Sequence, residues 1–305
     1  RLFPILLLSG LALSGCSLLG QAMAGEPPVP TVTPSLPAPE TAVIDNTPEP
    51  ANAAVQPVPI GWTVESFAAG LEVPWDMAFT SDARMLVAER GGSIREINNG
   101  QLSPHPLYVF EDVARVGGEA GLMGMAADPD YEMNRYIYAC YALPEGSGLI
   151  NRIVRLVDRP NAMEFERVIL DNIPSARNHA GCRVRFGPDG KLYATIGDSL
   201  EPSLAQNLDS LAGKILRINP DGSQPEDNPF ENSYVFSYGH RNPQGIAWHP
   251  VTGLLYSTEH GPSGFDGPPG GDEINLIEAG ANYGWPLVSH DDLLEGTLPP
   301  MTQFT

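Results

Sequence analysis

A short strand, a tight turn and a second strand rich in β-forming residues recur four times, and this repeat restricts the possible folds most. The turns are built from Gly, Pro and Asp, which is typical of β-hairpins. The copies lie near Ala78, Ala126, Arg185 and Ala247, at intervals of roughly 50 to 60 residues. A hairpin returning at this spacing predicts the blades of a β-propeller, whereas a β-sandwich would not require the same unit four times. Four copies suit a small closed ring or part of a larger one.

The N-terminal region has a different composition and predicts export. Residues 1–15 combine Arg1, an apolar run and small residues before Cys16, which fits a lipoprotein signal peptide; an ordinary cleaved signal is the alternative. Residues 26–59 are rich in proline and lack Lys, Arg and aromatic side chains, so we expect 16–59 to be lipidated Cys16 followed by a disordered linker. A proline-rich recognition segment is the other interpretation. The folded domain then covers 60–305, outside the cytoplasm, anchored by lipid at the cell envelope (periplasm, outer membrane or outer face of the cell membrane).

The charge of the chain excludes one class of partner. Asp and Glu number 37 against 17 Lys and Arg, giving a net charge of −20, and Lys191 and Lys214 are the only lysines. Binding to nucleic acid needs cations against phosphates, so a nucleic-acid partner is excluded, and a polybasic membrane surface is equally disfavoured.

Three polar loops between the repeats are candidates for chemistry. His179 stands just before a predicted strand, where an imidazole can present a proton acceptor, although a histidine that is simply hydrogen-bonded is the plainer interpretation. Arg241 and Asn242 lie between two glycines and offer a guanidinium and an amide to an anion; a solvated turn is the alternative. Asp272 and Glu273 follow a loop whose carbonyls and carboxylates suit calcium rather than zinc, unless they are solvated acids.

These loops occur within a pattern that resembles a known family. The residues between about Leu71 and Pro286 resemble the soluble pyrroloquinoline-quinone (PQQ) sugar dehydrogenases, especially the bacterial aldose sugar dehydrogenase branch. The resemblance is carried by the stretches 73–79, 121–124, 186–193, 196–198, 239–245 and 259–286. It implies an all-β, six-bladed propeller, of which about four blades are present here, that binds PQQ and Ca²⁺. It also implies oxidation of the anomeric hydroxyl of an aldose to a lactone, with electrons passed to an external acceptor.

Roles in the reaction follow from the same resemblance. His179 matches the general base that removes the sugar hydroxyl proton. Arg241 and Asn242 match residues that contact PQQ, and the arginine stabilises charge on the reduced quinone. His260 and Asp272 match positions near the cofactor.

The resemblance also implies metal ligands and shows two departures. Backbone carbonyls at Gly261 and Pro262 match ligands of the PQQ-bound calcium, and Glu273 with Tyr283 matches a second, structural calcium. Glu119 stands where the family places a glutamine beside PQQ. Residues 264–269 are an insertion in the calcium loop. We expect the chain to be the N-terminal part of a longer protein and, alone, to bind PQQ weakly.

Two cysteines remain, Cys140 and Cys182, in different predicted blades. A disulfide is permitted outside the cytoplasm, but we expect two buried thiols. Cys182 lies three residues after His179, yet a nucleophilic pair is disfavoured because no orienting Asn or Asp is evident.

Two rival functions stay open. A propeller of the same scaffold that binds a partner without catalysis is favoured by Glu119, whereas the intact His179 and Arg241–Asn242 set favours the enzyme. A calcium-dependent lactone hydrolase ranks last, because its acidic and asparagine ligand pattern is missing.

Overall fold

Strands supply nearly all regular structure in the part of the chain that the computed structural model describes, residues 63–304 without 291 and 293. The predicted signal peptide, Cys16 and the linker to residue 59 lie outside these residues. The helical elements described are one turn of helix, α1 (Tyr131–Asn134), and a 3-10 helix, η1 (Pro202–Gln206). Among the described residues, no helix has the length and apolar character needed to cross a membrane.

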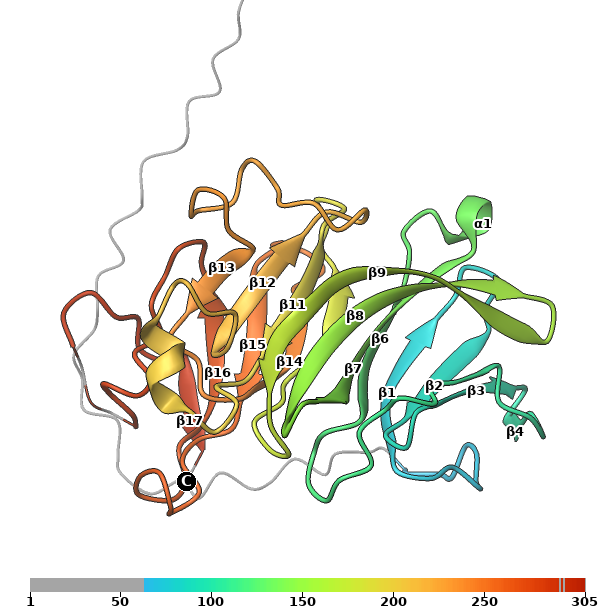
Figure 1. The fold of residues 1–305 in the computed structure, drawn as a ribbon, viewed down its shortest axis with the longest axis horizontal. Coiled ribbons are helices and arrows are strands. Elements are labelled where there is room, and N and C mark those ends of the chain that lie inside the picture. Colours follow the sequence, from blue (N-terminus) through green and yellow to red (C-terminus); the bar gives the residue numbers. More distant parts are fainter. Residues whose placement is uncertain (1–62, 291, 293, 305) are drawn as a thin grey trace, which may run out of the picture. The chain divides into compact units, whose positions relative to one another are not determined.

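The strands form four antiparallel sheets, each made from consecutive segments of chain (Figure 1). The first sheet has the order β1-β2-β3-β4, with β5 also pairing β3, and the others run β6 to β9, β10 to β13 and β14 to β17. The bounds in the first two sheets are β1 (Pro74–Phe79), β2 (Met85–Glu89), β3 (Ser93–Asn98), β4 (Gln101–Leu102), β5 (Tyr108–Val109), β6 (Leu122–Ala127), β7 (Tyr136–Glu145), β8 (Gly148–Arg159) and β9 (Ala162–Ser175). Those in the last two are β10 (Val184–Phe186), β11 (Leu192–Ile196), β12 (Lys214–Ile218), β13 (Val235–Tyr238), β14 (Pro243–Trp248), β15 (Leu255–Glu259), β16 (Asp272–Ile277) and β17 (Thr302–Phe304).

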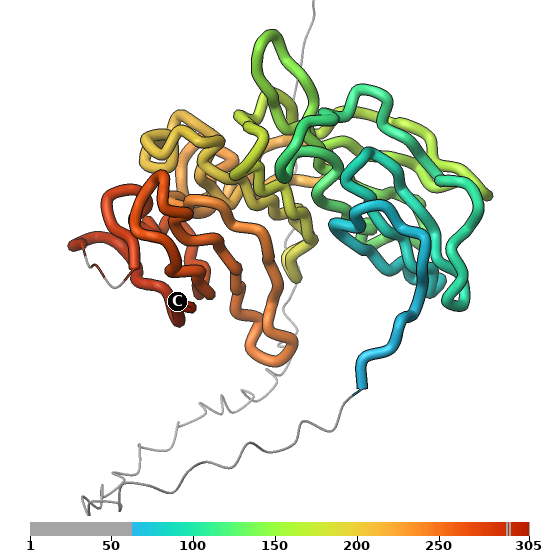
Figure 2. The backbone as a smooth tube through the Cα atoms, turned by 90° about the horizontal axis from the view of Figure 1, so that it is seen from below, coloured from blue at the N-terminus to red at the C-terminus, as the bar shows by residue number. Residues whose placement is uncertain are grey.

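The sheets are the blades of a propeller, so the prediction of four blades is confirmed. Figure 2 shows them following one another along an arc in chain order. Their first strands contact each other in sequence, β1 with β6, β6 with β10 and β10 with β14, and therefore line the axis. The predicted turns join the strands: in the third blade Gly187 N–H donates to the carbonyl of Lys191 at 2.9 Å, and Gly190 has a φ of +71°, which favours glycine.

Apolar side chains fill the space between neighbouring blades. Each pair of blades shares one buried cluster because every sheet presents alternate residues to both of its faces. Buried members are, between the first and second blades, Leu86, Ile94, Leu122 and Ile137; between the second and third, Tyr138, Ile153, Leu192 and Leu216; and between the third and fourth, Ile215, Ile246 and Leu255.

A buried carboxylate at the axis ties three blades together. Asp76 in β1 accepts hydrogen bonds from Met125 N–H of the second blade, at 2.8 Å, and from both terminal nitrogens of Arg185 in the third, at 2.7 and 2.8 Å. Arg183 adds an ion pair at 2.6 Å. Burial raises the pKa of Asp76, but the two arginines more than offset this and leave it below the ordinary value.

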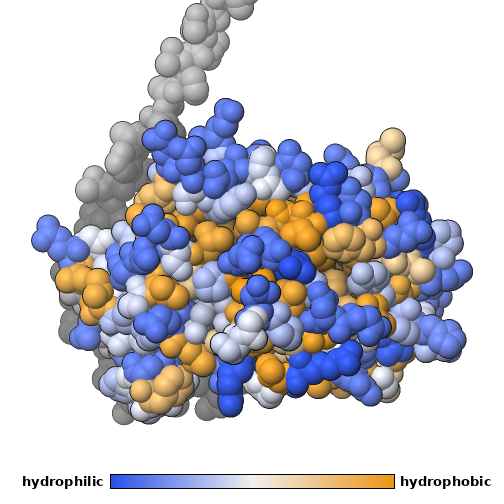
Figure 3. All heavy atoms as spheres, viewed as in Figure 1, coloured by the Kyte–Doolittle hydropathy of each residue, from blue (hydrophilic) through white to orange (hydrophobic). Residues whose placement is uncertain are grey.

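A hollow of about 880 Å³ opens where the first and fourth blades face each other. It is lined by side chains of β1 to β3 and of β14 and β15, most of them apolar, together with residues of the segment before β1 and with Arg183 and Arg185. Figure 3 shows a different, mixed face of the molecule, on which hydrophobic side chains reach the surface in several places among hydrophilic ones.

Candidate active site

A buried histidine–carboxylate pair is the centre of the site. His179 follows β9 and Asp198 follows β11, and Nδ1 of the imidazole lies 2.7 Å from Oδ1 of the carboxylate. Only 4% of His179 and none of Asp198 is exposed. Asp198 also accepts hydrogen bonds from the Trp285 indole at 2.8 Å and from Leu200 N–H at 2.9 Å. Since an ionised carboxylate only accepts hydrogen bonds, we infer that Nδ1 carries the proton and that Nε2 is left to accept one.

The segment that carries His179 has an unusual backbone conformation. His179, Gly181 and Cys182 all have positive φ angles, +54°, +60° and +74°. A side chain on Gly181 would lie 2.7 Å from the Thr195 carbonyl, so only glycine fits there. The Asn151 amide donates to the Ala180 carbonyl at 2.8 Å from β8, which fixes the middle of the segment.

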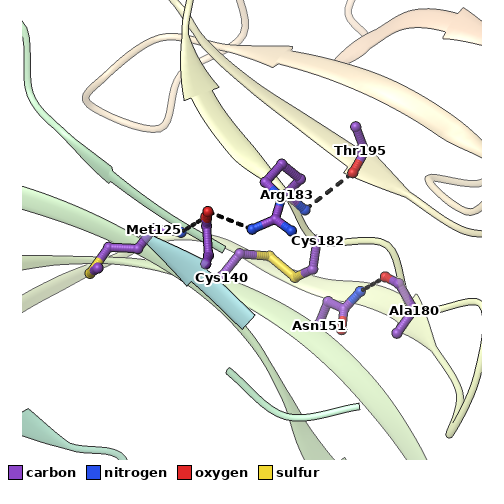
Figure 4. The surroundings of a disulfide bond; sticks show 8 residues. Met125, Cys140, Asn151, Ala180, Cys182, Arg183 and Thr195 are labelled. Atoms are coloured by element: carbon purple, nitrogen blue, oxygen red, sulfur yellow. Dashed lines mark hydrogen bonds and ion pairs between the residues drawn. A yellow bond between two sulfur atoms is a disulfide. The ribbon is translucent and has the colours of Figure 1, made fainter. Parts of the chain in front are cut away.

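A disulfide between Cys140 in β7 and Cys182 provides a further anchor (Figure 4), so the expectation of two thiols is wrong. The Cα atoms are 5.6 Å apart although the residues belong to different blades. Gly124 explains the approach: it pairs with Cys140 in the sheet, and a Cβ on it would lie 2.1 Å from the Cys182 carbonyl. With its sulfur bonded, Cys182 cannot be a nucleophile.

Arg241 lies beside this pair and is almost completely buried. Its backbone N–H donates to Glu259, whose carboxylate also meets the imidazole of His240 at 2.9 Å. The guanidinium donates to the His260 carbonyl at 3.1 Å and lies over the Trp285 ring, 5.6 Å from its centroid. A buried guanidinium of this kind is suited to bind a carboxylate or another planar anion.

Glu119 is held at the same site by neutral donors. Its carboxylate accepts hydrogen bonds from Asn242 Nδ2 at 3.1 and 3.2 Å, Gln244 Nε2 at 3.1 Å and Ala180 N–H at 3.3 Å. It therefore links the His179 segment to the Arg241–Asn242 loop. The structure thus brings together four predicted residues, His179, Arg241, Asn242 and Glu119.

The segment 263–266, which includes the start of the predicted insertion 264–269, also enters the site. The Phe265 ring stacks on the imidazole of His179, with centroids 5.9 Å apart and planes at 29°. Asp266 Oδ2 accepts a hydrogen bond from Arg241 Nε at 2.7 Å, and Ser263 Oγ accepts one from Arg241 Nη2 at 3.2 Å. The sequence marked this stretch only as an insertion and gave no indication of these contacts.

The predicted calcium-loop residues lie on one side of Arg241. Together they surround a hollow of about 20 Å³, room for roughly one water or ion. Its lining includes Arg241, Glu259, His260, Gly261, Pro262, Glu273, Tyr283 and Trp285. Asp272 lies next to this group: it accepts a hydrogen bond from Gly261 N–H at 2.9 Å, and Oδ1 lies 3.7 Å from His260 Nδ1, with both side chains more than half exposed.

These residues fit a cation in part. Burial and the neighbouring Glu259 carboxylate raise the pKa of Glu273 to about 7, so the carboxyl would lose its proton more easily beside a bound cation. By contrast, the Tyr283 hydroxyl donates to the Leu276 carbonyl at 2.5 Å and accepts from Glu278 N–H at 2.9 Å, so it is not available as a ligand. The described residues contain no group of three or more His, Cys, Asp or Glu side chains placed to hold a metal.

Asp198 and Trp285 are the functional residues that reasoning from the sequence missed, since no orienting acid was identified for His179. The available signal was position: Asp198 comes two residues after β11, and His179 lies in the loop before β10, the strand that pairs antiparallel with β11.

Fold and site together define a propeller whose blades bring a buried histidine–carboxylate pair next to a buried arginine. Residues 71–304 match the family model described as Glucose / Sorbosone dehydrogenase, and the chain belongs to that family of sugar dehydrogenases, which are oxidoreductases.

The relatives agree with this membership. The chain is 35% identical over 249 residues to aldose sugar dehydrogenase YliI of Escherichia coli, covering 78% of this chain and 65% of that protein. It is 34% identical over 253 residues to quinoprotein glucose dehydrogenase B of Acinetobacter calcoaceticus, covering 72% and 52%. The chain thus spans between half and two thirds of the length of these two relatives.

Solved structures give the same result. A putative oxidoreductase (glucose dehydrogenase) of Thermus thermophilus superposes with a TM-score of 0.73 at 45% identity, covering 78% of this chain and 72% of that one. The PQQ-bound aldose sugar dehydrogenase of Streptomyces coelicolor does so with a TM-score of 0.71 at 34% identity, covering 79% and 70%.

Proposed function

We propose that the full-length protein is a PQQ- and calcium-dependent aldose dehydrogenase that oxidises the anomeric hydroxyl to a lactone and passes electrons to an external acceptor. The observation that carries this proposal is the buried His179–Asp198 pair next to Arg241, in a member of a sugar dehydrogenase family. A PQQ-bound relative at 34% identity supports the choice of cofactor.

His179 is the proton acceptor in this scheme. Oxidation of the anomeric carbon removes one proton from the hydroxyl and one hydride from carbon. His179 Nε2 takes the proton, and Asp198 stabilises the resulting imidazolium through Nδ1. PQQ, when bound, supplies the acceptor for the hydride. The proton then leaves to solvent, which restores the neutral base.

Arg241 and Asn242 are the groups that would hold the quinone cofactor, because together they offer a cation and an amide to an acidic ring system. Calcium would be held by the carbonyls of Gly261 and Pro262 and, at a second position, by the carboxylate of Glu273. The two carboxyl groups of Glu259 and Glu273 at one small hollow support a hard cation there.

Reconstitution tests the proposal. The full-length protein, freed of metal, is mixed with PQQ and Ca²⁺ and assayed for dye reduction with a panel of aldoses. We expect activity that needs both additions and is lost in His179→Ala. No activity with any sugar, together with no change in the PQQ absorption spectrum, would refute it.

A non-catalytic binding propeller is the second candidate, because two carboxylates face the residues expected to contact PQQ. Glu119 is bound to Asn242, and Asp266 to Arg241. The substitution Glu119→Gln separates the two functions. If the protein is an enzyme with a variant site, the parent protein already binds PQQ and oxidises sugar. If the site is degraded, the parent protein does neither, and PQQ binds only after the substitution.

We also propose that the protein is a lipid-anchored, extracytoplasmic protein. The disulfide supports this location, since such bonds persist in oxidising compartments. Labelling of cells with radioactive palmitate should mark the parent protein and not Cys16→Ala; equal labelling of both would refute the anchor.

A six-bladed ring is the related structural proposal. The apolar hollow between the first and fourth blades supports it, because further blades would cover these side chains. A crystal structure of the full-length protein decides between this and a four-bladed form.

A further inference from the structure

The segment 263–266, here called the inner loop, contacts both groups on which the proposed reaction depends. It leaves the calcium loop just after Pro262 and directs two consecutive side chains inward, Phe265 onto His179 and Asp266 onto Arg241. Nothing in the reaction proposed above uses either residue. Their placement therefore needs an explanation of its own.

Asp266 is bound to Arg241 out of contact with water. The side chains are 6% and 3% exposed, and the Nε to Oδ2 distance is 2.7 Å. The second oxygen, Oδ1, accepts the backbone N–H of Ser263 at 3.0 Å, so the carboxylate is held at both ends. Burial raises the pKa of Asp266, but the hydrogen bonds from Arg241 and Ser263 together with the charge of Arg241 more than offset this and keep the pKa below the ordinary value.

The inner loop occupies one whole edge of the guanidinium. Asp266 takes Nε and Ser263 takes Nη2, and this Nε–Nη2 edge is the one that binds planar anions with two parallel hydrogen bonds. Nη1 is directed at the His260 carbonyl. An anionic ligand that requires this edge of Arg241 has to remove Asp266 first.

Phe265 covers the base in the same arrangement. Its ring stacks on His179 while 68% of its surface remains exposed, so a large apolar side chain lies between the imidazole and solvent without being buried itself. Because Phe265 and Asp266 are consecutive, a movement of the loop backbone that takes Asp266 from Arg241 also takes Phe265 from His179. Release of Arg241 and uncovering of His179 are therefore one event.

We propose that Asp266 is an internal carboxylate that occupies the anion site of Arg241 in the ligand-free protein, and that it makes the site selective for multiply charged planar anions. A ligand with several carboxylates replaces Asp266 on Arg241 and lifts Phe265 from His179. A neutral sugar alone does neither. The inference rests on the proposed function for the identity of the natural anion, PQQ.

Two variants with the same change in net charge test the exchange. Asp266→Asn removes the competing charge and keeps the shape of the side chain. The control, Asp82→Asn, removes an equal charge from the turn between β1 and β2, where Asp82 forms a half-exposed ion pair with Arg135. With full-length protein and a fixed Ca²⁺ concentration, PQQ is titrated and binding is followed by tryptophan fluorescence. We expect Asp266→Asn to lower the Kd about tenfold and Asp82→Asn to leave it within about twofold. An unchanged or higher Kd in Asp266→Asn overturns the inference.

A second measurement separates this inference from the proposed function. Hydrogen exchange at the Ser263 amide, which donates to Asp266, reports whether the inner loop is in place. Benzene-1,2,4-tricarboxylate, a planar anion without redox chemistry, should speed that exchange at least tenfold in the parent protein. If PQQ does not bind but the tricarboxylate speeds exchange, the proposed function fails and the inner-loop inference holds. If PQQ binds and neither anion changes the exchange rate, the inference is wrong and the function holds.

Discussion

Breaking the Cys140–Cys182 disulfide should lower stability by an amount that follows from the length of the loop it closes. The two residues are 42 positions apart. Chain-entropy theory gives about 4 kcal/mol for a loop of this length, within the range of 2–5 kcal/mol for loss of native disulfides. For a domain of this size, 1 kcal/mol corresponds to a shift of about 2–4 °C in Tm, so we expect a decrease of roughly 8–16 °C.

The assay compares the parent protein with the double variant Cys140→Ala/Cys182→Ala, with and without reductant. Reductant should lower the Tm of the parent to near that of the variant and leave the variant unchanged, which separates the covalent bond from the loss of side-chain volume. A difference in unfolding free energy below about 1 kcal/mol would refute the reasoning. So would two thiols titrated in the denatured, unreduced parent.

The same disulfide should matter for the proposed reaction. Cys182 and His179 have left-handed backbone conformations, each costing of order 1–3 kcal/mol unless the surroundings enforce it. Removal of the bond therefore loosens the segment that holds the base. We expect a lower kcat with little change in the Kd for PQQ, because Arg241 and Asn242 are held by separate contacts with Glu259 and Glu119.

Three further outcomes test the site and its surroundings. Asp198→Asn should lower kcat by at least about a hundredfold with the fold intact, because the amide no longer stabilises the imidazolium; a change below threefold by steady-state assay excludes the pair as catalytic. Burial lowers the pKa of Lys214 to about 7, and its ammonium donates to three backbone carbonyls. Stability should therefore rise with pH between about 7 and 10, by at most about 1.4 kcal/mol per pH unit, in the parent and not in Lys214→Met, measured by urea unfolding at each pH. Glu273 should change stability with pH in the opposite direction. Because its pKa is raised to about 7, the metal-free protein should lose stability as pH rises from about 5 through 7. Ca²⁺ should reverse this loss in the parent but not in Glu273→Gln. Equal thermal unfolding curves for both proteins at pH 5 and 8 would contradict the last prediction.

The blades were predictable because their signals are local. Each turn needs Gly, Pro or Asp at fixed offsets, as at 187–190, and each strand that follows is apolar enough to identify. His179 and Arg241 could be selected as candidates for a related reason, since polar residues in short loops at strand ends are conspicuous in sequence.

The missed features are pairings between segments distant in sequence. Asp198 lies in the loop after β11, and the register of the antiparallel β10–β11 pair, which the sequence does not reveal, places it beside His179. The disulfide depended on the missing side chain of Gly124, which no property of the two cysteines reveals. Asp266 reads as a surface acid among glycines and prolines until its contact with Arg241 is seen.

The burial of the Arg241 charge gives a reason for the Asp266–Arg241 contact. A buried guanidinium without an anionic partner costs several kcal/mol, so Arg241 needs an anion in every state of the protein. Glu259 cannot supply it, because its carboxylate is used by the Arg241 backbone and by His240. In the ligand-free protein Asp266 fills this role, and a ligand carboxylate that replaces it conserves the number of ion pairs. Binding then requires only that Asp266 return to water, where a carboxylate is stable, and the arginine can remain buried and aligned before any ligand arrives.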